Sequence, residues 1–281
     1  MDRIKVCAVC MHSEPGEVGE NLKKIREFSL NAASNGAHIV CFPELSVTGY
    51  LLKDPIKGLG GFSFDYIVDS LVRIADESSN LIIAGLVEPD KEGRGAYIAQ
   101  VVIGANGIIG IYRKTHLSPL EKNVYLSGNE LLIHSIDKLS FGIQLCYEAH
   151  FPEISTIMAL MGAELIFIPH ASPRGSPEEK FNSWMRHLKA RAFDNGLFVV
   201  SCNQVGKTRG NFAFPGVAIG IGPDGEIIDY LLTEKEDMLL ITIDKKQLSQ
   251  VRNNVMRYFL PHRRPELYAR IFYEKKRHPL S

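Results

Sequence analysis

The sequence predicts a mixed α/β fold, and three observations support this prediction. Short apolar runs typical of buried strands alternate along the chain with amphipathic segments of helical periodicity. Turn residues, above all glycine, separate these segments at short intervals. The composition, with 45% hydrophobic and 23% charged residues over 281 positions, is that of an ordinary globular protein with a packed core.

The first half of the chain combines two predicted helices with five predicted strands. A helix is expected at 17–35 because apolar residues recur there at helical spacing and Gly36 follows as a stop signal. A second helix is expected at 64–77. The predicted strands are 4–10, 37–42, 80–86, 97–103 and 108–113. Ala105-Asn106-Gly107 between the last two is a hairpin signal.

The second half begins with a predicted β-α-β unit, in which a helix at 152–161 lies between strands at 141–145 and 164–168. Ser176, followed by a proline and two glutamates, is a compact helix start, and it predicts one helix that continues to Asn195. The remaining predicted strands are 197–203, 214–222, 226–230 and 238–243. No Pro/Ser-rich linker divides the chain, so we expect residues 1–281 to form a single domain.

The last stretch, about 256–281, combines basic residues with tyrosine, phenylalanine and leucine. This is too many aromatic residues for a solvated tail, so the segment is predicted to be an arm that packs on another surface. That surface is either a second subunit or the arm's own domain, and the sequence does not decide between them.

Charge and hydropathy exclude several kinds of partner. Lys+Arg and Asp+Glu each number 32, so no whole-chain field would attract nucleic acid or anionic lipid. No run approaches the roughly 18 apolar residues of a membrane span, and the first residues enter a strand pattern rather than a signal peptide. We therefore expect a cytoplasmic protein with no nucleic-acid and no membrane partner. Its five cysteines are sparse and odd in number, which favours reduced thiols.

No motif indicates a nucleotide or a metal. Gly58-Leu59-Gly60-Gly61 lacks the strand and the lysine of a phosphate-binding loop. Cys7 and Cys10 form a C-x-x-C, but an offset of three in a strand puts the two side chains on opposite faces. No second pair or histidine spacing completes a zinc site. The sequence therefore predicts no cofactor and no metal.

Three reactive side chains follow apolar strands: Glu44, Lys114 and Cys146. Ligands of open α/β sheets gather at the carboxyl ends of strands, so these three could converge on one cleft. Spacing alone leaves the structural alternatives open, namely a loop-capping glutamate, a surface ion pair and an inert core thiol. At a strand-to-helix elbow, the helix N-terminus and a nearby cation would lower the pKa of the Cys146 thiol.

Three segments resemble the signature motifs of the nitrilase superfamily, the carbon-nitrogen hydrolases. They are 41–50, 112–117, and 146–148 with 151–153. The resemblance extends over nearly the whole chain, and three ordered motifs are far more specific than one. It implies a four-layer α-β-β-α sandwich that assembles into a homodimer or a larger homo-oligomer.

The resemblance also implies roles for individual residues. Glu44 would be the general base, Lys114 the electrophilic support and Cys146 the nucleophile. Glu121 would orient the substrate and the lysine, and the backbone N–H of Tyr147 would join Lys114 in an oxyanion pocket. Three further residues fall where the family lines its pocket: Tyr50, His170 and Ala171.

The implied reaction is hydrolysis of a small linear amide or N-carbamoyl compound through a cysteine thioester. Two departures from the family bear on the substrate. Carbamoylases of amino acids carry arginines just past the cysteine, where this chain has Glu148-Ala149-His150. Tyr147 replaces the tryptophan that generally follows the cysteine of true nitrilases. The alternatives are a nitrilase that converts a nitrile to an acid and ammonia, and a non-catalytic scaffold on the same fold.

Overall fold

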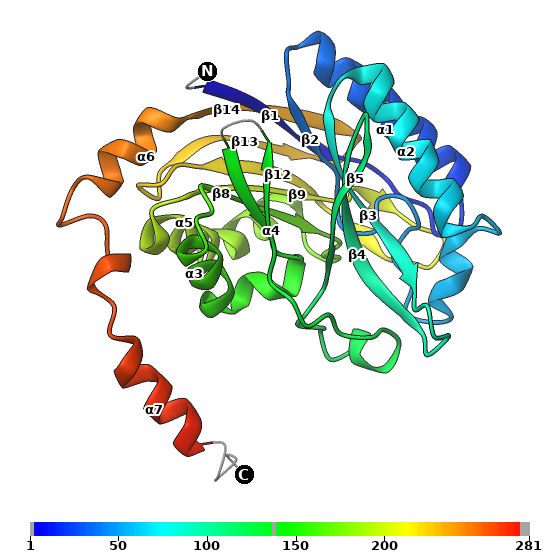
Figure 1. Cartoon of the computed structure of the whole chain (residues 1–281). Helices are drawn as coiled ribbons and strands as arrows, with labels where there is room; N and C mark the ends of the chain where they lie inside the picture. The colour runs from blue at the N-terminus through cyan, green and yellow to red at the C-terminus, as the bar shows by residue number, and fades with distance from the viewer. Residues whose placement is uncertain (1–2, 137–138, 276–281) are drawn as a thin grey trace.

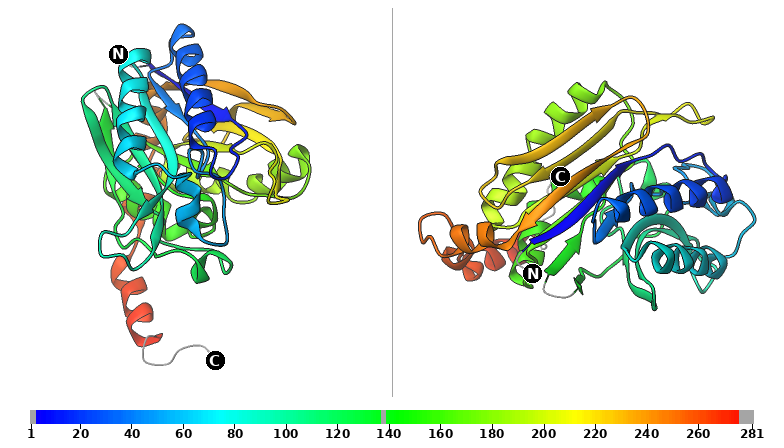
Figure 2. Two further views of the ribbon diagram at one scale, coloured as in Figure 1. Left: turned by 90° about the vertical axis from the view of Figure 1, so that its right-hand side faces the viewer. Right: turned by 90° about the horizontal axis from the view of Figure 1, so that it is seen from above.

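Two six-stranded sheets packed face to face form the centre of the protein (Figure 1). The computed structural model describes residues 3–136 and 139–275. Helices cover the outer face of each sheet, which confirms the four-layer α-β-β-α sandwich (Figure 2). These helices are α1 (Val18–Ser34) and α2 (Phe64–Ser78) on one face, and α3 (Pro152–Leu160), α4 (Pro177–Met185) and α5 (Leu188–Asn195) on the other.

The first sheet takes five strands from the beginning of the chain and one from near its end, whereas the second sheet takes its six strands from the stretch between them. The first sheet contains β1 (Arg3–Cys10), β2 (Ile39–Cys41), β3 (Leu81–Pro89), β4 (Ala96–Gly104), β5 (Gly107–Arg113) and β14 (Asp237–Asp244). The second contains β6 (Ile133–Ile136), β7 (Leu139–Ile143), β8 (Leu165–His170), β9 (Phe198–Asn203), β12 (Gly216–Ile221) and β13 (Ile227–Thr233). A separate ribbon pairs β10 (Gly206–Lys207) with β11 (Ala213–Phe214).

Strand direction decides where the loops emerge. In the order β14-β1-β2-β3-β4-β5, β2 runs parallel to β1 and β3. The hairpin predicted at Ala105-Asn106-Gly107 is confirmed: β4 is antiparallel to β3 and β5 is antiparallel to β4. β5 therefore points the same way as β2, and the loops after both strands leave the same edge. In the second sheet, β7, β8 and β9 are parallel and likewise share an edge.

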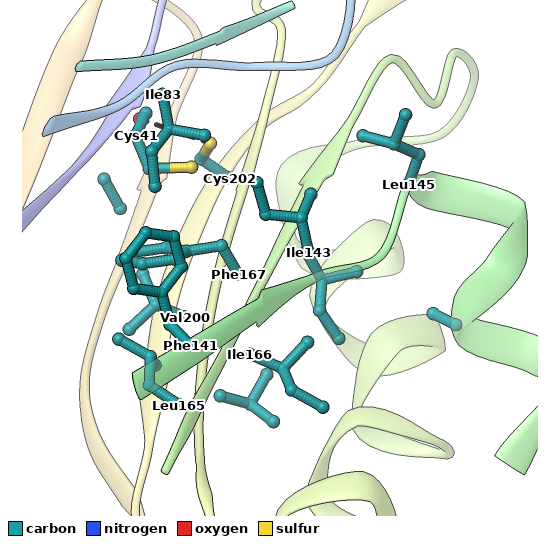
Figure 3. Packing of buried hydrophobic residues seen from close by; sticks show 14 of the residues in the cluster. Cys41, Ile83, Phe141, Ile143, Leu145, Leu165, Ile166, Phe167, Val200 and Cys202 are labelled. Atoms are coloured by element: carbon teal, nitrogen blue, oxygen red, sulfur yellow. Dashed lines mark hydrogen bonds between the residues drawn. The ribbon is translucent and has the colours of Figure 1, made fainter. Parts of the chain in front are cut away.

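Alternate residues of the strands fill the core on both faces. On β1, Ile4 and Cys10 belong to the cluster that joins the two sheets, whereas Cys7 packs in the cluster under α1 and α2. The two cysteines of the C-x-x-C therefore point to opposite faces. Across the sandwich, Cys41 of β2 and Cys202 of β9 lie side by side, with the sulfur of Cys202 3.6 Å from the carbonyl oxygen of Cys41 (Figure 3).

The predicted single helix from Ser176 to Asn195 is wrong, because the structure has two helices there, α4 and α5. The break falls at Arg186 and His187, where His187 adopts φ −129°. The ring of His187 packs against that of His150, 4.6 Å away between centroids. A tertiary contact thus interrupts a segment whose local pattern is helical throughout.

The C-terminal segment begins on the sandwich and then leaves it. After α6 (Lys245–Arg252), which the sequence did not predict, Leu260 is buried and Tyr258 packs on the core. α7 (Pro265–Lys275) projects away from both sheets (Figures 1 and 2), and Leu267 is 47% exposed. Over the described residues, no helix is both long and apolar enough to cross a bilayer.

We predict that Gly85→Ala lowers the free energy of unfolding by about 1–3 kcal/mol. Gly85 lies on β3 under the loop that carries Glu44, and a β-carbon there would clash with the backbone nitrogen of Leu45 and lie 2.8 Å from the carbonyl oxygen of Pro43. Backbone atoms cannot rotate away, so the loop has to move. Chemical denaturation followed by circular dichroism measures the effect.

The matched control is Gly19→Ala on α1, where a β-carbon meets open space. Its stability should be unchanged or slightly higher, because alanine favours the helix over glycine. Equal stability of the two variants would contradict the close approach at Gly85.

Candidate active site

Loops from both sheets meet at one end of the sandwich. Glu44 follows β2 and Lys114 follows β5 of the first sheet, whereas Cys146 follows β7 and Ala171 follows β8 of the second. The backbone N–H of Ala171 donates a hydrogen bond to Glu44 Oε2 at 3.0 Å, and Gln204, just past β9, donates to the Glu44 carbonyl oxygen at 2.8 Å. These contacts join the edges of the two sheets where the candidate residues lie.

Lys114 lies in a buried ion cluster and not in a surface ion pair. Its side chain is fully buried, with Nζ 2.7 Å from Glu44 Oε1 and 2.9 Å from Glu121 Oε2. Glu121 is held in turn by the Tyr50 hydroxyl, at 3.3 Å, and by the backbone N–H of Ser118, at 2.8 Å. The structure therefore brings together the ammonium group of Lys114, the nearby Glu121 and the carboxylate of Glu44, which is 70 residues away in sequence.

Burial controls the protonation of this cluster. Loss of water raises the pKa of Glu44, Lys114 opposes that rise, and Glu121 adds to it. Burial also disfavours the Lys114 ammonium, but the two carboxylates outweigh that cost and raise the pKa of Lys114 well above its ordinary value. Lys114 therefore stays charged, while Glu44 binds a proton more readily than an exposed glutamate does.

Cys146 sits at a strained elbow next to the cluster. Its φ is +45°, a region that costs a non-glycine residue about 1–2 kcal/mol. This strain directs the partly exposed side chain away from the strand and into a pocket. A cysteine that only filled the core would not need this backbone.

The expectation that a helix N-terminus and a cation lower the thiol pKa is wrong. Burial raises the pKa of Cys146, Glu44 raises it further, and Lys114 only partly opposes them. A short 3-10 turn, Cys146–His150, separates the sulfur from α3, which begins at Pro152. The resting thiol is therefore protonated and needs a neighbouring base to become a nucleophile.

Glu148 is a buried connector between two loops of the site. Its carboxylate accepts hydrogen bonds from the backbone N–H of Thr115 and of Leu145, both at 2.7 Å. The Tyr112 hydroxyl donates to it at 2.9 Å. It thereby fixes the loop after β5 against the loop after β7. In the sequence, Glu148 was noted only as part of the cysteine motif. Its role as a connector follows from its burial, which the sequence does not show.

The cluster adjoins a pocket of about 160 Å³. Its lining includes Tyr50, Glu121, Cys146, Tyr147, His170 and Lys180. Ala171 is buried and reaches Glu44 through its N–H instead. Burial lowers the pKa of His170 well below its usual value, and its Nδ1 lies 2.7 Å from the Ile168 carbonyl oxygen. The ring is therefore neutral, with a fixed orientation.

Residues of α4 and of the turn after it were missed by sequence reasoning. Lys180, Ser183, Trp184 and His187 line the pocket, although their segment reads as an ordinary amphipathic helix. No local signal marks them. Their role follows from the docking of α4 over the end of the sandwich.

Within the described residues, no group of three or more His, Cys, Asp or Glu side chains is arranged to hold a metal ion.

Residues 5–253 match the family model described as carbon-nitrogen hydrolase. The chain belongs to the carbon-nitrogen hydrolase family. It is 29% identical to the probable nitrilase C965.09 of Schizosaccharomyces pombe, over 96% of this chain and 98% of that protein. It is 28% identical to a nitrilase of Pyrococcus abyssi, over 95% of this chain and all of that protein.

Solved structures share the fold of this carbon-nitrogen hydrolase. An amidase from Nesterenkonia sp. has a TM-score of 0.82 at 23% identity and covers 95% of each chain. A carbon-nitrogen hydrolase from Helicobacter pylori G27 has a TM-score of 0.85 at 24% identity, over 96% of this chain and 98% of that one. In a mutant of the Nesterenkonia amidase, the acetamide moiety of fluoroacetamide is attached covalently to the active-site cysteine.

The resemblance seen in the sequence is thus confirmed, and the protein is a hydrolase of the nitrilase superfamily. Membership of a hydrolase family overturns the alternative of a non-catalytic scaffold.

We predict that Glu148→Gln lowers the free energy of unfolding by about 1–3 kcal/mol, because an amide NH₂ would face N–H donors that now point at a carboxylate. The loops after β5 and β7 should loosen together. Thermal unfolding and hydrogen exchange of the amides of Thr115 and Leu145 measure both effects.

Glu153→Gln is the control, since Glu153 is an exposed glutamate on the neighbouring helix α3. It should leave stability and exchange as they are in the wild type. If Glu148→Gln behaves like this control, Glu148 does not connect the two loops.

Proposed function

We propose that this carbon-nitrogen hydrolase cleaves a small linear amide or N-carbamoyl compound through a thioester on Cys146. The observation that carries the proposal is the buried cluster of Glu44, Lys114 and Glu121 beside a partly exposed cysteine. The pocket is smaller than the roughly 300–1,000 Å³ of sites that hold drug-sized ligands, which favours a substrate of few atoms.

In the first half of the reaction, Glu44 removes the thiol proton as the Cys146 sulfur attacks the carbonyl carbon. The raised pKa of Glu44 suits it to this role as general base. Negative charge develops on the carbonyl oxygen, where an N–H of the Lys114 ammonium and the backbone N–H of Tyr147 stabilise it. Glu121 holds Lys114 in place without removing its charge.

In the second half, the proton on Glu44 passes to the nitrogen, the C–N bond breaks, and ammonia or an amine leaves. An acyl or carbamoyl thioester remains on Cys146. Glu44 then takes a proton from water, the resulting hydroxide attacks the thioester carbon, and the proton returns to the sulfur as the acid departs. These steps require only the named groups and water.

A nitrile is the second candidate substrate. The names of two curated relatives, at 28% and 29% identity, favour it. Tyr147 after the cysteine favours the amide and carbamoyl branches over true nitrilases. We rank the amide and the N-carbamoyl compound first.

The test is ammonia release from an aliphatic amide, an N-carbamoyl amine and a nitrile of equal chain length. We expect turnover of at least one of the first two compounds. Cys146→Ala should abolish it, because the nucleophile is lost, and intact-protein mass spectrometry should detect an acyl adduct on wild-type Cys146 only. Turnover of the nitrile alone would reverse the ranking, and full activity of Cys146→Ala would refute the mechanism.

We further propose that the protein forms a homodimer or a larger homo-oligomer. Supporting this, α3 and the residue after it present Leu160 and Met161 to solvent at 60% and 50% exposure. Near the start of the C-terminal segment, Val255 and Met256 are 71% and 83% exposed. Apolar side chains exposed in groups mark interaction surfaces, and a second copy would bury them.

Leu160→Glu combined with Met256→Glu should convert the assembly to monomers, because charged residues are disfavoured in the core of an interface. Light scattering coupled to size-exclusion chromatography gives the mass. Ile56→Glu is the control and should not change the mass, because Ile56 is 44% exposed in the 3-10 turn Pro55–Leu59, which packs on β3 of the first sheet. A wild-type monomer would disprove the proposal outright.

A further inference from the structure

A second ammonium group faces the pocket. Lys180 on α4 is partly buried and lines the same pocket as Cys146. Its Nζ donates hydrogen bonds to the Ser172 hydroxyl at 2.8 Å and to the Pro173 carbonyl oxygen at 3.0 Å. Both acceptors are neutral, and an ammonium group has three N–H donors. One donor and the whole positive charge are therefore left for a ligand.

The surroundings of Lys180 do not neutralise this charge. Within residues 3–136 and 139–275, no carboxylate forms an ion pair with Lys180. Lys114, by contrast, is compensated twice, by Glu44 and by Glu121. Desolvation lowers the pKa of Lys180, Cys146 opposes that shift and Arg174 adds to it. The net fall is expected for a cation that has lost water without gaining a carboxylate partner.

The histidines that line the pocket do not supply a second positive charge for a ligand. Burial lowers the pKa of His170 well below its usual value and that of His187 to about 4, so both rings are neutral at pH 7. Burial also lowers the pKa of His150, the last residue of the 3-10 turn before α3. Of the described residues that line the pocket, Lys180 is thus the cation without a counter-ion.

A capping box fixes the start of the helix that carries Lys180. Ser176 and Glu179 form a capping box, with the Glu179 N–H donating to the Ser176 hydroxyl at 3.2 Å and the Ser176 N–H donating to Glu179 Oε2 at 2.9 Å. Lys180 is the next residue. Ser183, one turn further on the same face, also lines the pocket and can donate a hydroxyl hydrogen bond. An ammonium and a hydroxyl on one rigid helix face suit a carboxylate.

We propose that Lys180, assisted by Ser183, binds a carboxylate of the substrate, so that the enzyme selects small amides or carbamoyl compounds that carry one negative charge. This inference rests on the proposed function. It assigns charge selection to α4, whereas Ala149 and His150 after the nucleophile supply no guanidinium group. The reacting carbonyl lies at Cys146 and the charged end at Lys180.

The alternative is a purely structural role, in which Lys180 is a strut, that is, a side chain that only supports a neighbouring loop. Its bonds to Ser172 and Pro173 support the loop whose Ala171 N–H holds Glu44. A strut would affect every substrate equally, because it acts through the base. A carboxylate site affects only charged substrates, mainly through KM. The two roles therefore separate in a comparison of charged and neutral substrates.

The experiment compares kcat/KM for butyramide, for succinic acid monoamide with its carboxylate on the acyl chain, and for N-carbamoylglycine with its carboxylate on the leaving group. The wild type should prefer one of the two anionic compounds. Preference for the monoamide would place the bound carboxylate on the acyl side of the C–N bond, and preference for N-carbamoylglycine would place it on the leaving-group side. Lys180→Met should lower kcat/KM by about 10- to 100-fold more for that compound than for butyramide, the value of a charge-assisted hydrogen bond. Lys180→Arg should retain the preference.

Arg174→Met is the matched control, because Arg174 is an exposed cation close enough to influence Lys180 electrostatically. It should leave the preference intact. Equal loss on charged and neutral substrates in Lys180→Met would establish the strut instead, and a wild type without charge preference would overturn the inference.

A binding measurement separates this inference from the proposed function. In Cys146→Ala, calorimetry should detect tighter binding of the preferred anionic compound than of butyramide, and Cys146→Ala with Lys180→Met should lose that difference. Amide turnover without a charge preference refutes only the role of Lys180. Charge-dependent binding without turnover of any amide refutes only the proposed reaction. Equal binding of both ligands refutes the role of Lys180 whatever the turnover.

Discussion

Burial of the Lys114 ammonium is the constraint on which the site depends. A charge removed from water is tolerated only when it is paired and hydrogen-bonded, and breaking a buried pair costs about 3–5 kcal/mol. Glu44 and Glu121 provide the compensation from two different loops, and Ala171 of the other sheet holds the far oxygen of Glu44. The hydrogen bonds that compensate this one charge thus link the two sheets at the end of the sandwich where the pocket lies.

The same low-dielectric environment accounts for the chemistry that we propose. Burial raises the pKa of both the Glu44 carboxyl and the Cys146 thiol, so in the proposed mechanism a strengthened base takes the proton of a weak acid. The thiol need not be ionised at rest, because its proton can move as the sulfur attacks. Two residues with positive φ, Leu45 directly after Glu44 and Cys146 itself, show that the fold accepts backbone strain to direct these loops.

Sequence reasoning succeeded where the signal was local or was a motif. The period of two on β1 placed Cys7 and Cys10 on opposite faces, and Asn106-Gly107 marked a hairpin. It failed where a distant contact decides the outcome. The helix that continued to Asn195 in the prediction breaks at His187, which packs on His150 from another loop. The thiol pKa was expected to fall, but burial, which spacing cannot show, raises it.

The order of the motifs by itself determined the family and the four-layer fold, and it named Glu44, Lys114, Cys146 and Glu121 as candidates, because these depend on residue types at fixed positions along one chain. Only the tertiary structure decided what surrounds them. Glu148 connects two loops and Lys180 enters the pocket because separate elements dock at one end of the sandwich. Burial, charge compensation and pocket lining are sums over neighbours distant in sequence, so they exist only once the two sheets and their helices have packed.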